Sequence, residues 1–153
     1  MMSTRLILAM TLGCGTGFAT LAEAACEPGS KTVFSCQTAK GKLIKVCDSG
    51  KTIDYTFGKP ELAPEIVVRA PRGEASTFQW QGIGRYISYS VSIPNGNTVY
   101  SVFWSLDKLS ENRAIEAGVN VEVKQKLVAT VNCADAKSIV QNIEGIHLKP
   151  AVD

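Results

Sequence analysis

This chain has almost no histidine. It also lacks metal-binding cysteine motifs and glycine-rich phosphate loops. One histidine, His147, occurs in 153 residues, and no C-x-x-C pair is present. A serine or cysteine nucleophile needs a base within hydrogen-bonding reach, most often a histidine. The stretch "GIGR" at residues 82–85 lacks the third glycine and the following helix of a phosphate-binding loop. We therefore expect no catalytic residue, no metal site, no cofactor and no enzymatic activity.

A strong net charge is also missing. Sixteen lysines and arginines stand against fourteen aspartates and glutamates, which gives a formal net charge of +2. The basic residues form no run along the chain. Domains that bind nucleic acids usually carry a marked basic excess on one face. We therefore expect no nucleic-acid partner.

No apolar run is long enough for a stable membrane span, but the N-terminus has the pattern of a secretory signal peptide. Residues 1–5 carry one positive charge, residues 6–22 are apolar or small, and "AEA" at residues 22–24 is a small-x-small cleavage site. We predict a signal peptide at 1–24 and a single mature β domain at 25–153 without a membrane span, periplasmic or secreted. A competing interpretation is lipoprotein processing at Cys14, although Thr11 stands where a large aliphatic residue is expected.

Cysteine usage agrees with export. Cys14 would leave with the signal peptide, and four cysteines remain. An even number in an oxidising compartment indicates two disulfides, with three possible connectivities. The four are Cys26, Cys36, Cys47 and Cys133.

The spacing of the first hairpin favours one of these connectivities. Residues 32–47 predict two strands around a turn at residues 40–41, which sets Cys36 opposite Lys45 and diagonal to Cys47. Diagonal separations are long for a disulfide. The preferred bonds are therefore Cys36–Cys133 and Cys26–Cys47. A one-residue change in the turn would instead make Cys36 and Cys47 direct partners.

Alternating apolar and polar residues predict the fold class. β-Branched and aromatic residues recur at every second position, turn signals separate them, and no 3.6-residue stripe competes. We expect an all-β domain, a small antiparallel barrel or sandwich of about 8–9 strands with two disulfides. A further hairpin is expected at 119–133, with its turn around Lys124 and Gln125. Residues 134–153 are expected to form a loosely packed C-terminal tail, or a short helix that Asp135 caps and that runs through Gln141.

The stretch "RYISYSVSIPNGNTVYSVFW" at residues 85–104 predicts a long hairpin. Asn95-Gly96 is a strong type I′ turn signal, and pairing outward from it sets Val91 opposite Tyr100. One face of this hairpin is apolar and the other carries serines, so most of its aromatic residues are expected in the core. Phe103 is the exception, because it falls on the serine face opposite Ser88. The polar connection that follows, at 107–118, is expected to be a loop or one helical turn.

Three stretches of the chain resemble a known family. They are "GRY" at 84–86, "YSVFWS" at 100–105 and "VNC" at 131–133. Together they resemble the bacterial membrane-bound and periplasmic inhibitors of c-type lysozyme. The resemblance implies a small eight-stranded β-barrel and a disulfide that reaches the C-terminal strand. The pattern "C…GK…C…YxFGKP" nearer the N-terminus looks like that of small exported proteobacterial proteins.

Two residues that those inhibitors insert into the lysozyme cleft are replaced here. Gly82 stands where the resemblance implies a loop serine, and Leu106 stands where it implies a lysine. Lys108 lies nearby but out of register. We therefore expect weak inhibition of c-type lysozyme, or none.

The resulting functional hypothesis is a non-enzymatic exported binding protein of the bacterial envelope. Its partner would be a protein, for example a host or envelope enzyme that degrades the cell wall and that it would inhibit. The alternative is a structural or accessory envelope protein. A small cell-wall hydrolase ranks last, because no carboxylate stands in a context that would raise its pKa. The candidate partner-binding residues are Arg85, Phe103 and Lys108.

Overall fold

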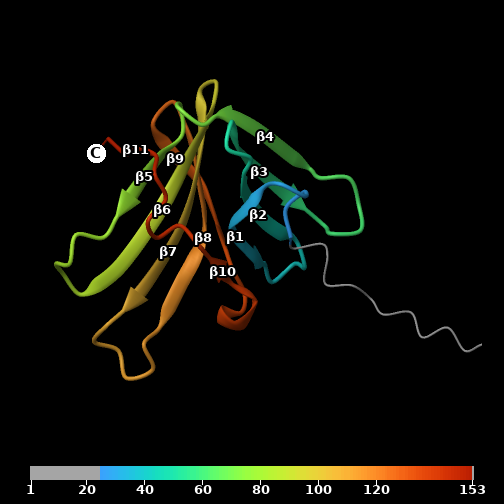
Figure 1. Cartoon of the computed structure of the whole chain (residues 1–153). Helices are drawn as coiled ribbons and strands as arrows, with labels where there is room; N and C mark the ends of the chain where they lie inside the picture. Colours follow the sequence, from blue (N-terminus) through green and yellow to red (C-terminus); the bar gives the residue numbers. More distant parts are fainter. Residues whose placement is uncertain (1–24, 153) are drawn as a thin grey trace, which may run out of the picture.

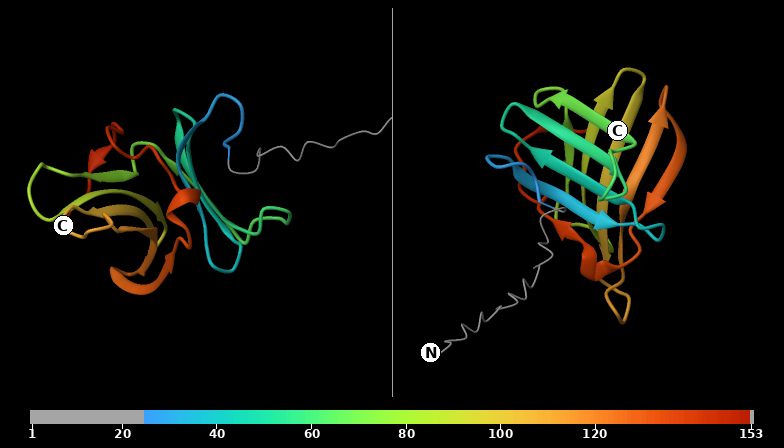
Figure 2. Two further views of the ribbon diagram at one scale, coloured as in Figure 1. Left: turned by 90° about the horizontal axis from the view of Figure 1, so that it is seen from below. Right: turned by 90° about the vertical axis from the view of Figure 1, so that its right-hand side faces the viewer.

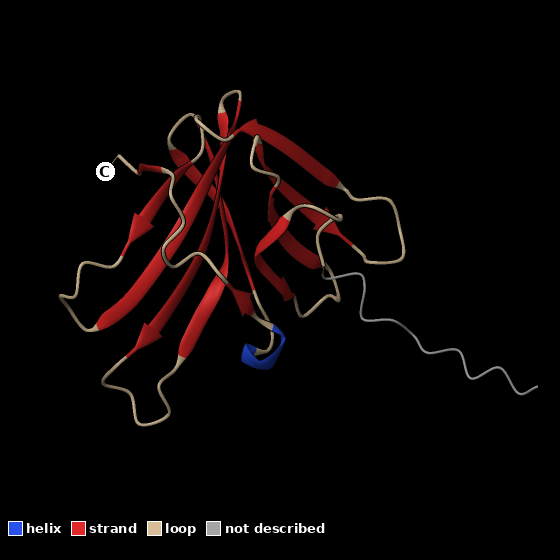
Figure 3. Ribbon diagram, viewed as in Figure 1, coloured by secondary structure: helices blue, strands red, loops and turns tan. Residues whose placement is uncertain are grey.

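The computed structural model describes residues 25–152. The predicted signal peptide at 1–24 and the alternative lipid-attachment site at Cys14 lie outside these residues. Within them, the regular secondary structure is almost entirely β-strand, with one short 3-10 helix (Figure 3). The strands form two sheets that pack against each other (Figure 1).

The first sheet has five strands in the order β10-β1-β2-β3-β4. All four of its pairings are antiparallel. Its long strands follow one another along the chain, and the two-residue β10 adds to the free edge of β1. The strands are β1 (Lys31–Gln37), β2 (Leu43–Asp48), β3 (Thr52–Gly58), β4 (Ile66–Pro71) and β10 (Val140–Gln141).

The second sheet has six strands in the order β11-β5-β6-β7-β8-β9. Its pairings are antiparallel except for β11, which pairs in parallel with β5. The strands are β5 (Ser76–Gln79), β6 (Tyr86–Asn95), β7 (Thr98–Asp107), β8 (Ile115–Val123), β9 (Lys126–Asn132) and β11 (Lys149–Pro150).

The two sheets remain open, so the fold is a sandwich and the expected alternative of a closed barrel is wrong. Strands of the first sheet cross obliquely over those of the second (Figure 2). The all-β class, the predominantly antiparallel pairing and the nine long strands are confirmed. β10 and β11 were not expected, because strands of two residues leave no periodic pattern in a sequence.

The core lies between the sheets. Phe34, Ile44 and Tyr55 of the first sheet are fully or almost fully buried against Val91 and Val102 of the second. The Tyr55 ring stacks on that of Tyr100 across the sheets, with 4.8 Å between centroids. Burial, and to a smaller extent Tyr100, raises the pKa of the Tyr55 hydroxyl. The prediction that most hairpin aromatics serve the core is confirmed, because Tyr89, Tyr100 and Trp104 all belong to it or pack on it.

Both predicted disulfides are confirmed. Cys36–Cys133 joins β1 to the residue after β9, and Cys26–Cys47 joins the N-terminal segment to β2. The predicted register of the first hairpin is wrong by one residue: Cys36 lies opposite Ile44, and Lys45 lies opposite Ser35. The reason is a wider turn, in which the Thr38 amide donates to the Lys42 carbonyl.

This one-residue shift in the pairing of β1 with β2 changes which side chains of the two strands share a face of the sheet. Cys36 shares the inward face with Ile44 and is fully buried, so its sulfur points toward the second sheet, where Cys133 lies. Cys47 lies farther along β2, where it meets Cys26 of the N-terminal segment.

The long hairpin of β6 and β7 also forms one residue away from its expected turn. Gly96 and Asn97 are the central turn residues, and Val91 lies opposite Val102. Of these two residues, Gly96 alone has a positive φ, +61°, which fits a turn with glycine at its first central position. Partners change by two residues, so the faces are preserved: Phe103 lies on the serine face, opposite Ser90 rather than Ser88.

The next two predicted features differ in outcome. The turn between β8 and β9 is confirmed at Lys124 and Gln125, which both have positive φ. The connection at 107–118 is shorter than expected, because β8 begins at Ile115 and leaves only 108–114 as a loop. The four residues 115–118 pair with β7 instead.

The segment after Cys133 contains a helix, but it is shorter than expected, because Val140–Gln141 forms β10 instead of continuing it. It is a single 3-10 turn, η1 (Ala136–Ser138), and the Asp135 side chain accepts a hydrogen bond from the Lys137 amide. The loose packing expected for this segment is not observed. β10 and β11 tie it to both sheets, and Ile143 is fully buried in the core.

Removing Cys36–Cys133 should cost more stability than removing Cys26–Cys47. A single native disulfide in such a domain is worth on the order of 2–5 kcal/mol. The sequence separations are 97 and 21 residues, and the loop-entropy relation predicts a difference of about 1.4 kcal/mol between the two bonds. Urea denaturation of Cys36→Ala/Cys133→Ala and of Cys26→Ala/Cys47→Ala measures it. Greater loss in the second variant would contradict the loop-entropy account.

Candidate recognition site

Two loops lie side by side at one end of the six-stranded sheet. Residues 80–85 connect β5 to β6, and residues 108–114 connect β7 to β8. Both project beyond the ends of the strands at the lower left of Figure 1. The antiparallel pairing of β6 with β7 sets Tyr86 opposite Asp107, which brings the loops together. We refer to residues 80–86 and 107–114 as the paired loops.

An ion pair between Arg85 and Asp107 braces the paired loops. Arg85 Nε donates to Asp107 Oδ1 over 2.8 Å, and Nη2 donates to Oδ2 over 2.6 Å. This two-bond geometry is the strongest arrangement available to arginine and a carboxylate. The Arg85 hydrogen bond is the main reason why the pKa of Asp107 falls to about 2, and a bond from the Leu109 amide lowers it further. Asp107 is therefore charged at any physiological pH.

Asp107 also shapes its own loop through the backbone. Its Oδ1 accepts the Leu109 amide over 3.0 Å, and its carbonyl accepts the Ser110 hydroxyl over 3.1 Å. The Asp107 amide donates to the Ala114 carbonyl across the loop. Asp107 thus holds its own loop of seven residues and an arginine from the neighbouring loop.

Lys108 is fixed against the other loop. Its amide donates to the Arg85 carbonyl over 3.1 Å, and its Nζ lies 4.9 Å from the centre of the Trp80 ring. Trp80 is itself oriented by a hydrogen bond from Nε1 to the Ile83 carbonyl. Ammonium groups are attracted to the face of an indole ring. The ammonium group of Lys108 is therefore held beside Trp80 of the first loop.

Large apolar side chains are exposed around these cations. Ile83 is 83% exposed, Leu109 is 74% exposed and Tyr86 is 50% exposed. The guanidinium of Arg85 lies 5.5 Å from the centre of the Tyr86 ring, next to its ion pair. Exposed apolar side chains rimmed by charges are a common feature of protein-interaction sites. The paired loops therefore combine contact area with positive charge.

The structure brings together two of the three candidate residues. Arg85 and Lys108 both belong to the paired loops, and the backbone of one contacts the other. Phe103 lies apart from them within β7, five residues before Lys108. It pairs with Ser90 of β6 and Gly118 of β8, on the outer face of the sheet. Two of the five N–H donors of Arg85 are bound to Asp107, so this side chain braces the loops. The same side chain is about half exposed to solvent.

The residues aligned with the lysozyme-contacting positions lie nearby but offer little. Gly82 is within the first loop with φ +84°, and Leu106 is part of β7, opposite Ile87. Three residues of the paired loops were not among the expected site residues: Asp107, which braces the loops, and the exposed Ile83 and Leu109. A signal existed for Ile83, since an isoleucine between two glycines has no strand partner to bury it.

Comparison of the chain with protein-family models, with curated proteins and with solved structures finds no match. Within residues 25–152, no three histidine, cysteine, aspartate or glutamate side chains are grouped to hold a metal ion. No helix in that range is long and apolar enough to cross a membrane. The geometry of the paired loops is thus the main guide to function.

The Arg85–Asp107 pair makes stability depend on pH in a defined window. The pKa of Asp107 is about 2 in the folded chain, against ~3.9 for an unperturbed aspartate. A depressed carboxylate pKa stabilises the folded state above the unfolded value, and this contribution is lost as the pH falls toward 2. Asp107→Asn should therefore be less stable than wild type at pH 6, and this difference should vanish between pH 4 and about 2.

Urea denaturation at several pH values measures that difference. Glu111→Gln, in the same loop and without an ion-pair partner among the described residues, is the matched control and should track wild type. A stability gap between Asp107→Asn and wild type that stays constant down to pH 2 would show that the ion pair does not set the pKa.

Proposed function

We propose that the chain is a non-enzymatic binding protein of the bacterial envelope, which recognises a protein partner through the paired loops. The observation that carries this proposal is the exposure of Ile83 and Leu109 on loops that the Arg85–Asp107 pair holds in place. Two disulfides are compatible with an oxidising compartment, periplasmic or extracellular.

Preorganisation of the paired loops supports this proposal on energetic grounds. A loop that becomes ordered only on binding costs about 0.5–1.5 kcal/mol for each side chain immobilised. Asp107 and Lys108 already fix the backbone of both loops before a partner arrives. Little ordering cost remains, so burial of Ile83, Leu109 and Tyr86 is available for affinity.

The charges on the paired loops indicate what the partner offers in return. Asp107 offsets Arg85, while Lys108 and Arg113 outnumber Glu111. The complementary surface is an apolar recess with acidic groups at its rim. A cleft of a wall-degrading enzyme has this character, because glycoside hydrolysis uses a pair of carboxylates in a groove.

C-type lysozyme is not expected to be a strong target. The Leu106 side chain has no hydrogen-bond donor and Gly82 has no side chain, so neither aligned position offers a side-chain donor to catalytic carboxylates. The chain also carries a net charge of +2, which gives no long-range attraction to a cationic lysozyme. The proposal therefore favours a partner with a different cleft.

Replacing both exposed loop residues should weaken partner binding strongly. The oxidised domain is used to capture a partner from envelope extracts and host secretions, and the captured protein is purified and titrated by calorimetry. Ile83→Asp/Leu109→Asp should weaken binding by about thirtyfold or more, which is typical of central apolar contacts. Leu62→Asp/Leu127→Asp alters two exposed leucines elsewhere and should bind as wild type.

A turbidity assay with c-type lysozyme belongs to the same experiment. Weak inhibition, or none, is expected, whereas the captured partner should be inhibited if it degrades the cell wall. Capture of no partner, or equal affinity of the loop variant and its control, would contradict the proposal. Nanomolar inhibition of c-type lysozyme that depends on Lys108 would contradict the expectation drawn from Leu106 and Gly82.

A further inference from the structure

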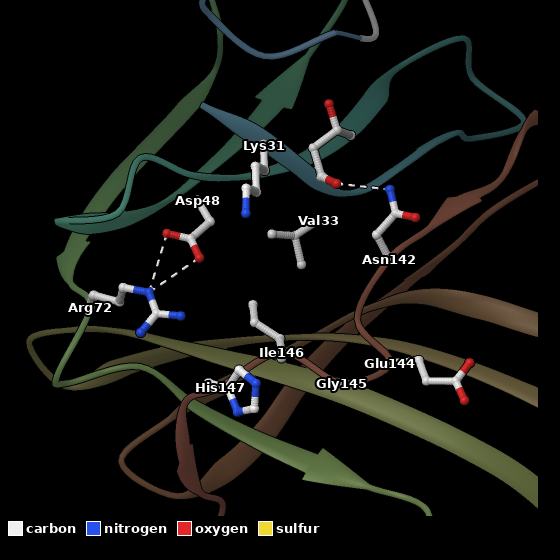
Figure 4. Close-up of a pocket in the computed structure, with 10 residues that line it drawn as sticks. Lys31, Val33, Asp48, Arg72, Asn142, Glu144, Gly145, Ile146 and His147 are labelled. Atoms are coloured by element: carbon white, nitrogen blue, oxygen red, sulfur yellow. Dashed lines mark hydrogen bonds and ion pairs between the residues drawn. The ribbon is translucent and has the colours of Figure 1, made fainter. Parts of the chain in front are cut away.

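A second surface feature lies between the five-stranded sheet and the segment after β10. It is an open groove of about 570 Å³ (Figure 4). It shares no lining residue with the paired loops, so a ligand bound in the groove would be independent of the partner proposed for those loops. The lining residues are Lys31, Thr32, Val33, Asp48, Arg72, Asn142, Glu144, Gly145, Ile146 and His147.

One end of the groove gathers three nitrogen-bearing side chains. Lys31 begins β1, Arg72 follows β4, and His147 belongs to the C-terminal segment. Figure 4 shows the Lys31 ammonium group and the Arg72 guanidinium turned toward the space in front of Ile146 and His147. Three segments far apart in the sequence thus direct nitrogen atoms into one region.

Arg72 is fixed but keeps free donors. Its Nε donates to both carboxylate oxygens of Asp48, over 3.3 and 3.1 Å. Asp48 is held in turn by the Gly50 amide over 2.8 Å, and the Arg72 amide donates to the Lys51 carbonyl. Within residues 25–152, the two terminal amino groups of Arg72 have no hydrogen-bond partner. They remain available to an acceptor in the groove.

The local charge at this end is positive. Asp48 offsets Arg72, and Lys31 has no ion-pair partner among the described residues. The other acid of the lining, Glu144, lies at the opposite side of the groove in Figure 4. Its carboxylate is close enough to Tyr89 to raise the pKa of that hydroxyl, whose own burial raises it more.

The middle of the groove is apolar. Val33 is almost fully buried and Ile146 packs against the core, and both side chains face the space in Figure 4. The side-chain Nδ2 of Asn142 donates to the Thr32 carbonyl over 2.9 Å, which fixes the Asn142 side chain at the rim of the groove. Small-molecule sites combine an apolar lining with a few placed polar groups in a volume of roughly 300–1,000 Å³.

We propose that this groove binds a small molecule in which a carboxylate or phosphate group is attached to a short apolar body. The oxyanion lies between the Lys31 ammonium group and the two free amino groups of Arg72. Arginine offers two parallel donors to such a group, and lysine adds a mobile cation with three donors. The apolar body lies on Val33 and Ile146, and His147 closes the groove on its other side.

The test is an NMR titration of the oxidised, isotope-labelled domain with four probes. N-acetyl-dialanine carries a free carboxylate and small apolar side chains, and its C-terminal amide is the uncharged match. Methyl phosphate and inorganic phosphate separate the phosphate source from the carboxylate source. Saturable shifts of the Val33, Gly145 and Ile146 amides are expected with at least one of the three anionic probes. The amide probe should bind about tenfold more weakly or not at all, since it lacks the charge.

Lys31→Ala should weaken binding of that anionic probe by about tenfold or more, while Lys40→Ala removes an exposed lysine outside the groove and should leave it unchanged. Arg72→Gln is the second variant, with a thermal melt to confirm that it is folded. Three outcomes would overturn the proposal: no saturable shift with any anionic probe at millimolar concentration, equal binding of the amide probe, or equal binding by Lys31→Ala and wild type.

Discussion

The two sheets share one apolar interface, closed by the stacked rings of Tyr55 and Tyr100 and by the Cys36–Cys133 bond. Because each sheet is open and buries only one face, the outer faces and the strand ends remain exposed to solvent. Surface chemistry therefore concentrates at the loops and where the C-terminal segment crosses the interface. The paired loops and the groove occupy these two kinds of position.

At the loop end, a single carboxylate does most of the organising. Asp107 ends β7, binds the guanidinium of Arg85 and accepts the amide of Leu109. Isolated surface ion pairs contribute little to stability, but here the ion pair also fixes two loop backbones. Ile83 and Leu109 are exposed on the two loops that this ion pair joins.

The sequence predicted the features that depend on local pattern. Alternation gave the strands, and Lys124-Gln125 gave one hairpin turn. The disulfides were inferred correctly although the register used for the inference was off by one residue, because in both registers Cys36 and Cys47 are not cross-strand partners. Of the two registers that failed, the first depends on the width of its turn, and the second depends on which residues of "PNGN" form the centre of the turn.

Features that depend on distant residues could not be read from the sequence. Arg85 and Lys108 were identified by their resemblance to an inhibitor motif, but the acid that braces them was not, since Asp107 meets Arg85 only after β6 and β7 pair. The groove depends even more on residues that are far apart in the sequence. Lys31, Arg72 and His147 come from three segments, and only the packing of the C-terminal segment brings them together. His147, the single histidine of the chain, lies at this groove.

The central claim is that the Arg85–Asp107 pair holds the paired loops in a binding-ready shape, and backbone ¹⁵N relaxation tests it most directly. The amides at 80–85 and 108–114 should show order parameters near those of the strands, about 0.85. In Asp107→Asn the same amides should become more mobile, while the Lys124-Gln125 turn is unchanged. Order parameters below about 0.6 in the wild-type loops, or no change in the variant, would contradict the claim.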